Sequence, residues 1–245
     1  MRRAPWVLAT LLLAGPLMSL ALGRASLDRD WRTASQQSVG LAPDPVGTQE
    51  PVVQVYAART VGWRGAFAVH TWLAVKPQGA TNYTRYEVIG WRLREGGSAV
   101  SVSSYRAPDG EWFGAKPELL SELRGVDAAG AIAKLPQLLA DYPDAGVYHA
   151  WPGPNSNTFI AYLGRELPEL HLTMPSIAVG KDYVPISQIV GPSPSHTGVQ
   201  VSLYGVLGAI VSRDEGLELN VLGLVTGIDF RHPAIKLPGL GRVPS

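Results

Sequence analysis

Residues 66–76 alternate between two kinds of side chain, which is the pattern of a β-strand. The odd-numbered positions are apolar except for Thr71, and the even-numbered positions include His70 and Trp72. Because successive side chains of a strand point to opposite faces of its sheet, His70 and Trp72 are expected on the same face. The segment is therefore predicted to be a strand.

Three neighbouring segments have similar character. Residues 52–58 alternate around valines, residues 83–94 are rich in aromatic side chains, and residues 99–105 alternate again. Residues 77–79 (Pro-Gln-Gly) and 96–97 (Gly-Gly) have the composition of turns. Together with 66–76, these segments predict a four-stranded antiparallel meander.

The middle of the chain changes to helical spacing. A proline at the first turn predicts a short helix at 117–123, and apolar residues three and four apart predict a second helix at 128–142. Pro136 is expected to kink or split this second helix. Asn155 or Ser156 is suited to cap a third helix, because both side chains accept hydrogen bonds from a first helical turn.

The last quarter of the chain is predicted to be extended. Residues 199–211 and 217–228 flank the sequence Ser-Arg-Asp-Glu-Gly at 212–216, which predicts a hairpin. The tail, 233–245, is rich in proline and glycine and is expected to be coil. The predicted fold class is α+β, an antiparallel sheet with a helical segment, in a single globular domain over 52–242.

The amino terminus has the parts of an export signal. Arg2 and Arg3 precede an uncharged, largely apolar run at 4–23 that ends in small residues. About 20 residues can also span a ~30 Å hydrocarbon core, so residues 1–24 are expected to be a cleaved signal peptide or a retained membrane anchor. Residues 25–51 read as a linker. The body is therefore expected to be exported to the periplasm or cell envelope, with the membrane as a partner if the segment stays.

Composition excludes several kinds of site. The 245 residues contain no cysteine, which rules out disulfides, thiolate metal sites and a cysteine nucleophile. The 21 Lys and Arg balance 20 Asp and Glu, which argues against nucleic-acid binding. The five histidines are scattered without metal-ligand spacing, so no metal and no cofactor are expected.

Two residues stand out as candidate catalytic groups. Ser156 stands at a predicted helix start, where the helix dipole and backbone donors favour a nucleophile. His70 lies on a predicted strand with small neighbours, as a general base would. The alternative interpretation is structural: a serine at a helix start is usually a cap, and a histidine beside Trp72 is usually packed.

Several segments of this chain resemble a family of uncharacterised bacterial proteins, domain of unknown function 3750. The resemblance runs from about Val52 to Arg242, and it implies no activity. The segments that carry it are Val69-His70-Thr71-Trp72, Trp151 to Phe159, Gly180-Lys181-Asp182-Tyr183 and Leu219 to Gly223.

A more distant resemblance is to circularly permuted papain-like proteins, which include the lecithin–retinol acyltransferase group. In that group a strand histidine precedes a helix-start Asn-Cys-x-His-Phe pattern, and here His70 precedes the segment 155–159. Ser156 stands where that pattern has cysteine, and Thr158 where it has the second histidine. The resemblance implies a papain-like core with a third, orienting residue, for which Glu87 and His149 are alternatives.

These observations favour a binding or structural module of the envelope with a degenerate papain-like site. Its pocket is expected between His70, Ser156 and aromatic walls, and it would take a peptide, a glycan or a lipid. The alternative is a serine-dependent amidase, esterase or acyltransferase acting on envelope substrates, with Ser156 attacking and His70 as base. The expected binding residues are Trp72, Tyr148, His149, Trp151, Asn155 and Asn157.

Overall fold

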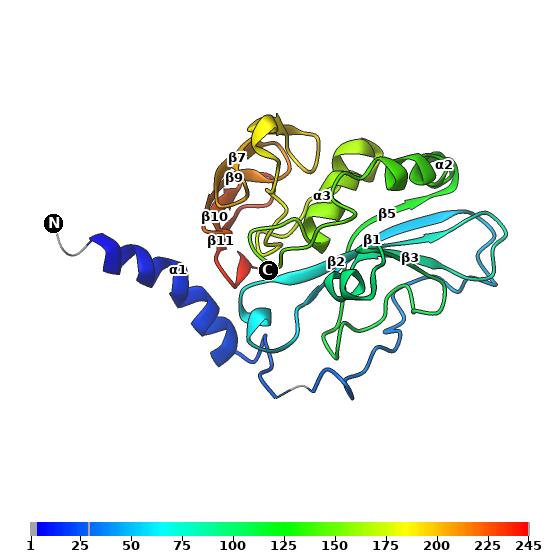
Figure 1. The fold of residues 1–245 in the computed structure, drawn as a ribbon, viewed down its shortest axis with the longest axis horizontal. Helices are drawn as coiled ribbons and strands as arrows, with labels where there is room; N and C mark the ends of the chain where they lie inside the picture. Colours follow the sequence, from blue (N-terminus) through cyan, green and yellow to red (C-terminus); the bar gives the residue numbers. More distant parts are fainter. Residues whose placement is uncertain (1–3, 29, 245) are drawn as a thin grey trace.

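Two antiparallel β-sheets form the body of the protein in the computed structural model, which describes residues 4–28 and 30–244 (Figure 1). Two helices cover one face of the first sheet, and the second sheet lies beside them. The coarse α+β class is confirmed. The papain-like permuted core is not confirmed.

The first sheet has the strand order β4-β3-β2-β1-β5, with every pairing antiparallel. Its central pair runs in register from Val52 opposite Lys76 to Arg59 opposite Val69, so the alternation in both strands creates two buried faces. The five strands are β1 (Val52–Arg59), β2 (Val69–Lys76), β3 (Thr84–Val88), β4 (Val100–Ser103) and β5 (Glu118–Arg124).

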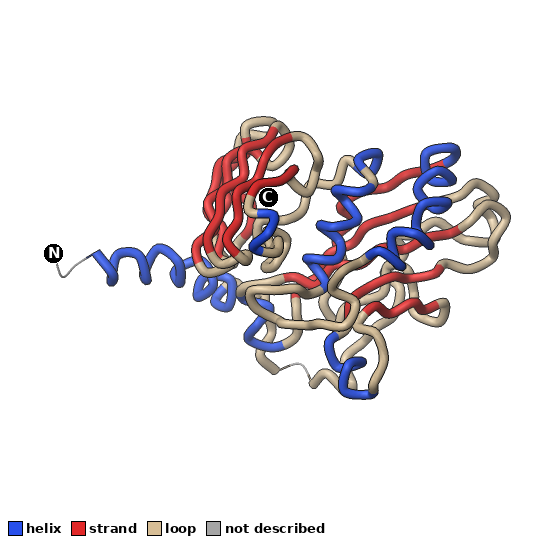
Figure 2. The backbone as a smooth tube through the Cα atoms, turned by 45° about the horizontal axis from the view of Figure 1, so that its top comes forward, coloured by secondary structure: helices blue, strands red, loops and turns tan. Residues whose placement is uncertain are grey.

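Helices α2 (Gly125–Asp141) and α3 (Ser156–Glu166) lie on one face of this sheet (Figures 1 and 2). The apolar stripe of α3, which includes Phe159 and Leu163, packs into the same core as Leu73 of β2. Short 3₁₀ helices occupy Gly62–Ala66, Gly90–Glu95, Pro168–Leu170 and Ile186–Gln188, and α1 (Ala4–Ala21) projects from the body.

The chain between α1 and β1 covers the other face of the sheet. A second core there contains Tyr56, Trp72 and Trp112. Residues 35–42, which the sequence assigns to a linker, bond to 109–114 through backbone groups and through the Asp109 carboxylate. This segment is therefore packed against the body.

The second sheet is a seven-stranded meander in which each strand pairs with the next along the chain. We call it the C-terminal sheet. Its strands are β6 (Val190–Pro192), β7 (Gly198–Leu203), β8 (Leu207–Ser212), β9 (Gly216–Val221), β10 (Leu224–Asp229), β11 (Ala234–Leu237) and β12 (Gly241–Val243).

Several local predictions were wrong. Residues 117–123 are not helical, because pairing with β1 makes 118–124 an edge strand, and the left-handed Gly125 (φ 61°) then starts α2. Pro136 does not split its helix, since α2 is continuous through it. The predicted strand at 83–94 ends at Val88 and continues as a 3₁₀ helix.

The C-terminal region was also partly mispredicted. The turn at 212–216 is correct, but each predicted arm folds back on itself, because left-handed Tyr204 and Leu222 create extra turns. The tail expected to be coil contains β11 and β12.

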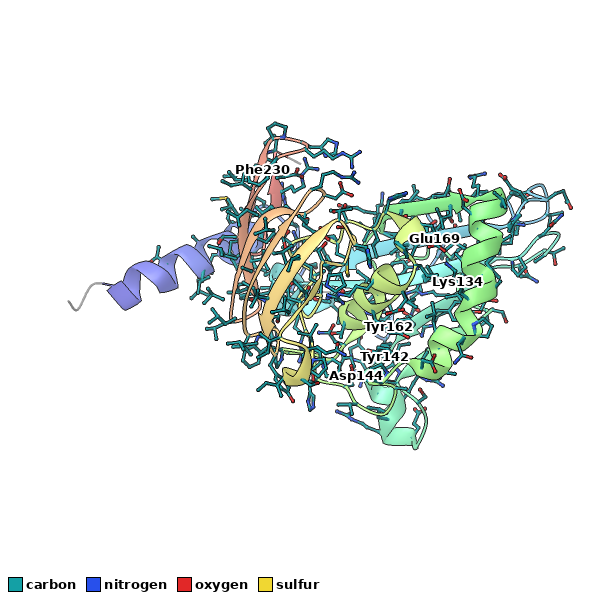
Figure 3. All side chains as sticks on the ribbon, turned by 90° about the horizontal axis from the view of Figure 1, so that it is seen from above. Lys134, Tyr142, Asp144, Tyr162, Glu169 and Phe230 are labelled. Carbon is teal, nitrogen blue, oxygen red and sulfur yellow. The ribbon has the colours of Figure 1, made fainter. Side chains whose placement is uncertain are left out.

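An ion pair on the surface joins α2 to the segment after α3 (Figure 3). Lys134 Nζ lies 2.7 Å from Glu169 Oε1, and at the other end of α2 the rings of Tyr142 and Tyr162 are 5.2 Å apart. Exposed ion pairs contribute little, so the buried helix faces carry most of the stability of this layer.

Candidate functional site

Helix α3 begins with a complete capping box. The Asn155 side chain accepts hydrogen bonds from the backbone N–H groups of Asn157 (2.9 Å) and Thr158 (3.2 Å), and Thr158 Oγ1 accepts one from the Asn155 N–H (3.1 Å). Asn155 Nδ2 also donates to the carbonyls of Ala150 and Val179. The Asn155 side chain therefore connects the start of α3 to two loops by hydrogen bonds.

The Asn157 side chain connects the same helix to the first sheet by hydrogen bonds. Its Nδ2 donates to the carbonyls of Val69 (3.0 Å) and Val179 (2.8 Å), and its Oδ1 accepts from Thr71 Oγ1 (2.9 Å). Both asparagines are buried, and their polar atoms are engaged within the protein. Asn155 and Asn157, which the sequence predicts as binding residues, therefore have a structural role, because they hold the start of α3 in place.

The structure does not bring the Ser156 and His70 side chains together. Thr71 Oγ1 donates to the Ser156 carbonyl (3.2 Å), so Thr71 is the β2 side chain that faces the start of α3. His70 is the neighbouring residue of the strand and therefore points to the opposite face, where its ring stacks on Trp112 with centroids 3.6 Å apart. The sheet separates the two predicted catalytic groups.

His70 instead belongs to a buried charged cluster on the other face. Its Nε2 lies 2.8 Å from Glu87 Oε2, and Arg85 Nη2 lies 2.9 Å from the same oxygen. The Arg85 guanidinium in turn lies over the Trp72 ring, 3.9 Å from its centroid. Of the two orienting residues considered, Glu87 contacts His70, whereas Arg85 and Trp112 were not foreseen.

The cluster has a definite protonation state. Burial would raise the pKa of Glu87, but the hydrogen bond from His70 and the charge of Arg85 outweigh it and hold this pKa at about 2. Burial lowers the pKa of His70, which opposes the effect of Glu87. A neutral His70 donating from Nε2 to Oε2 of an ionised Glu87 agrees with both shifts, and Arg106 Nη1 lies 3.6 Å from Oε1, the other carboxylate oxygen of Glu87.

The other predicted wall residues are dispersed. Trp72 is fully buried and donates from Nε1 to the Pro108 carbonyl, whereas Trp151 is half exposed and donates to the Leu222 carbonyl of the C-terminal sheet. The Tyr148 ring packs against Gly90, where a side chain would collide with it, and His149 is exposed. The expected pocket residues line neither the cavity between the two sheets nor two further surface cavities of the described residues.

Replacing Asn155 with alanine is expected to lower the free energy of unfolding by about 2 kcal/mol, because the cap is lost together with the side-chain hydrogen bonds to the carbonyls of Ala150 and Val179. Urea denaturation followed by tryptophan fluorescence measures this change. The matched control is Asn82→Ala at an exposed site. If the two variants have equal stabilities, the hydrogen bonds of the Asn155 side chain do not stabilise the fold.

The C-terminal sheet has an apolar outer face. The sequence pattern does not reveal this face, because residues 199–211 and 217–228 each have the pattern of one long strand. The strand pairings place its side chains in adjacent rows across the sheet, and none of them is charged. The outer face consists of Val190, Val199, Val201, Leu203, Leu207, Val211, Leu219, Ile228, Ile235 and Val243, each at least 36% exposed.

The inner face of the same sheet is largely polar and buried. Glu218 Oε2 lies 2.5 Å from Lys181 Nζ, and its Oε1 lies 2.6 Å from Lys236 Nζ. Lys181 also contacts Asp182, which accepts a hydrogen bond from Asn220. The usual arrangement of a sheet, with its polar face toward water, is reversed here.

Helix α1 docks beside this sheet. Pro16 packs against Gly239 in the β11–β12 turn, and Gly15 approaches the Pro238 carbonyl too closely for any side chain. Leu17 and Met18 are exposed on the helix surface. Within residues 4–28 and 30–244, no helix has both the length and the apolar character required to cross a bilayer. The same residues contain no cluster of three or more potential metal ligands.

Comparisons with known proteins identify one family. Searches of curated proteins and of solved structures returned no match, and the papain-like resemblance is not confirmed. The family described as "Protein of unknown function (DUF3750)" matches residues 50–183, more than half of the 245 residues, and the chain belongs to this family.

Proposed function

We propose that this protein is a non-catalytic binding module of the bacterial cell envelope that lies on a lipid bilayer through the outer face of its C-terminal sheet. The observation that carries the proposal is a seven-stranded sheet with an uncharged apolar surface directed outward. Patches of this kind on soluble monomers mark interaction sites, because exposed apolar area costs about 25 cal/mol per Å².

Two features favour lipid as the occupant. Helix α1 extends from the body on the side where the C-terminal sheet lies, and it adds exposed apolar side chains there (Figures 1 to 3). Phe230 is exposed at one end of the sheet, where an aromatic ring suits the bilayer interface (Figure 3). The exposed Arg213 and Arg231 lie in neighbouring turns at the same end and share the single carboxylate of Asp214, which leaves a net positive charge that suits anionic headgroups.

The amino-terminal sequence supports a position outside the cytoplasm. Arg2 and Arg3 followed by the run 4–23 have the order of an export signal. In this proposal the segment directs export, and where it is retained it holds the body at the membrane. Mass spectrometry of the mature amino terminus distinguishes these forms, because cleavage leaves a chain that begins near Arg24.

The catalytic alternative has less support. A serine-dependent hydrolase or acyltransferase requires His70 to reach Ser156, within about 3 Å in the reacting complex. His70 points to the face of β2 opposite to the one that faces the start of α3, and Glu87 engages His70. The binding interpretation requires no such contact.

The absence of cysteine makes a direct test possible. Leu219→Cys, labelled with a polarity-sensitive fluorophore, is expected to shift its emission to the blue when vesicles of phosphatidylcholine and phosphatidylglycerol are added to the full chain. The matched control is Val126→Cys, labelled identically at an exposed apolar residue on α2. Its emission is expected to stay unchanged.

Three outcomes would contradict the proposal. Equal shifts at both sites would indicate non-specific adsorption, and no shift at residue 219 would mean that lipid does not cover the outer face. A blue-shifted emission that rises with protein concentration before vesicles are added would identify a second copy of the chain as the occupant.

A further inference from the structure

A cavity of about 720 Å³ lies between the first sheet and the C-terminal sheet. Ala57 of β1 and Leu120 of β5 line one side, and Leu240 in the β11–β12 turn lines another. Met174 and Ile177 of the connecting segment complete its apolar wall. Cavities of this size hold small organic ligands, and they use a few polar groups to orient them.

Two arginines at this cavity lack a carboxylate partner among the described residues. Arg59 donates only from Nη1, to the carbonyls of Gly65 (2.8 Å) and Gly239 (2.7 Å), so its Nε and Nη2 donors remain available. Arg24 donates from Nη1 to the Leu240 carbonyl (3.2 Å). Both guanidinium groups therefore keep their positive charge uncompensated by an ion pair.

The charge around Arg59 is unfavourable without an additional anion. Burial lowers the pKa of Arg59 and the charge of Arg24 lowers it further, whereas Glu118 opposes these effects. The other two arginines of the lining already have partners, since Arg231 pairs with Asp214 and Arg242 with Asp229. An anion beside Arg59 and Arg24 would relieve this repulsion.

We propose that this cavity binds an amphiphile with a single anionic group, either a carboxylate or a phosphate monoester. Arg59 and Arg24 hold the anion through charge-assisted hydrogen bonds. The apolar wall formed by Met174, Ile177 and Leu240 holds the hydrocarbon part. This site is separate from the outer face of the C-terminal sheet and does not depend on vesicle binding.

Calorimetric titration of the full chain tests the proposal with four probes below their micelle concentrations. Decanoate and decyl phosphate are expected to bind, and decanol and inorganic phosphate are expected to bind at least tenfold more weakly. Arg59→Gln is expected to weaken decyl phosphate binding at least tenfold. The matched control, Arg94→Gln at an exposed site, is expected to bind like the unmodified chain.

The outcomes are separable from folding and from membrane binding. Arg59→Lys retains the charge if Arg59→Gln folds poorly, and it is expected to recover part of the affinity. The proposal would be overturned if neither decanoate nor decyl phosphate binds, or if decanol or inorganic phosphate binds as tightly as they do. It would also be overturned if both Arg59 variants bind decyl phosphate with the affinity of the unmodified chain. Because no vesicles are present, loss of vesicle contact by Leu219 leaves this result unaffected.

Discussion

Replacing Glu218 with alanine is expected to lower the free energy of unfolding by about 3 to 5 kcal/mol, because the buried ammonium group of Lys236 loses its carboxylate and that of Lys181 keeps only Asp182. Glu218 is 1% exposed and touches both Lys181 and Lys236, which are equally buried. Whole domains are stable by only about 5 to 15 kcal/mol. Urea denaturation should therefore show a large shift in midpoint.

Two further variants isolate the cause. Glu166→Ala removes an exposed carboxylate from α3 and is expected to change stability by less than about 0.5 kcal/mol. The quadruple variant Lys181→Met, Asp182→Asn, Glu218→Leu and Lys236→Met removes all four charges of the cluster together, and it is expected to recover most of the loss. A small effect of Glu218→Ala alone would mean that water reaches the two lysines.

The sequence predicts those parts of the fold in which local pattern and tertiary packing agree. The alternation at 66–76 predicts β2, and Asn155 predicts the start of α3, because neither depends on a distant partner. Residues 118–124 have an amphipathic composition that suits a short helix. Pairing with the free edge of β1 decides their conformation, and no local signal reveals that edge.

The candidate site shows the same division. The pattern places His70 and Trp72 on one face of β2, which the structure reproduces, and Thr71 faces α3 as the alternation requires. The hypothesis of a Ser156–His70 pair used the order of motifs along the chain and did not assign the face that α3 covers. Arg85 and Glu87 are two residues apart on β3 and therefore share a face of the sheet. The contact of Arg85 with Trp72 depends in addition on the order of the strands, which the local sequence does not give.

The reversed C-terminal sheet lies outside the part that matches the family, which ends at residue 183. In residues 199–211 apolar side chains recur at every second position, which identifies strands but not which face is buried. The buried face was decided by charges from elsewhere, since Lys181 precedes the sheet and contacts Glu218. Sequence periodicity alone assigns the apolar side to the interior and is wrong here.

Acid is expected to destabilise this protein in two steps that arise from His70 and Glu87. The folded state holds the pKa of His70 below its ordinary value of 6.5, mainly because the ring is buried. Below pH 6.5 the unfolded chain therefore binds a proton that the folded chain does not, and stability falls as the pH decreases. At higher pH this contribution is fully present.

The second step arises from Glu87. The pKa of Glu87 is about 2 in the folded state against 4.5 ordinarily, so stability falls again as the pH drops from 4.5 toward 2. The full shift corresponds to about 3 kcal/mol. Urea midpoints measured from pH 7 to pH 2.5 should show both steps.

Glu87→Gln separates the two steps. The variant is expected to be about 3 kcal/mol less stable at pH 7, because Arg85 and His70 lose their shared carboxylate, and its stability should not fall between pH 4.5 and pH 2.5 through this site. The matched control is Glu95→Gln, which removes an exposed carboxylate and should retain both steps. Parallel pH curves for Glu87→Gln and the unmodified chain would mean that Glu87 is not the group that titrates, and the buried cluster would then lose its place as the source of acid sensitivity.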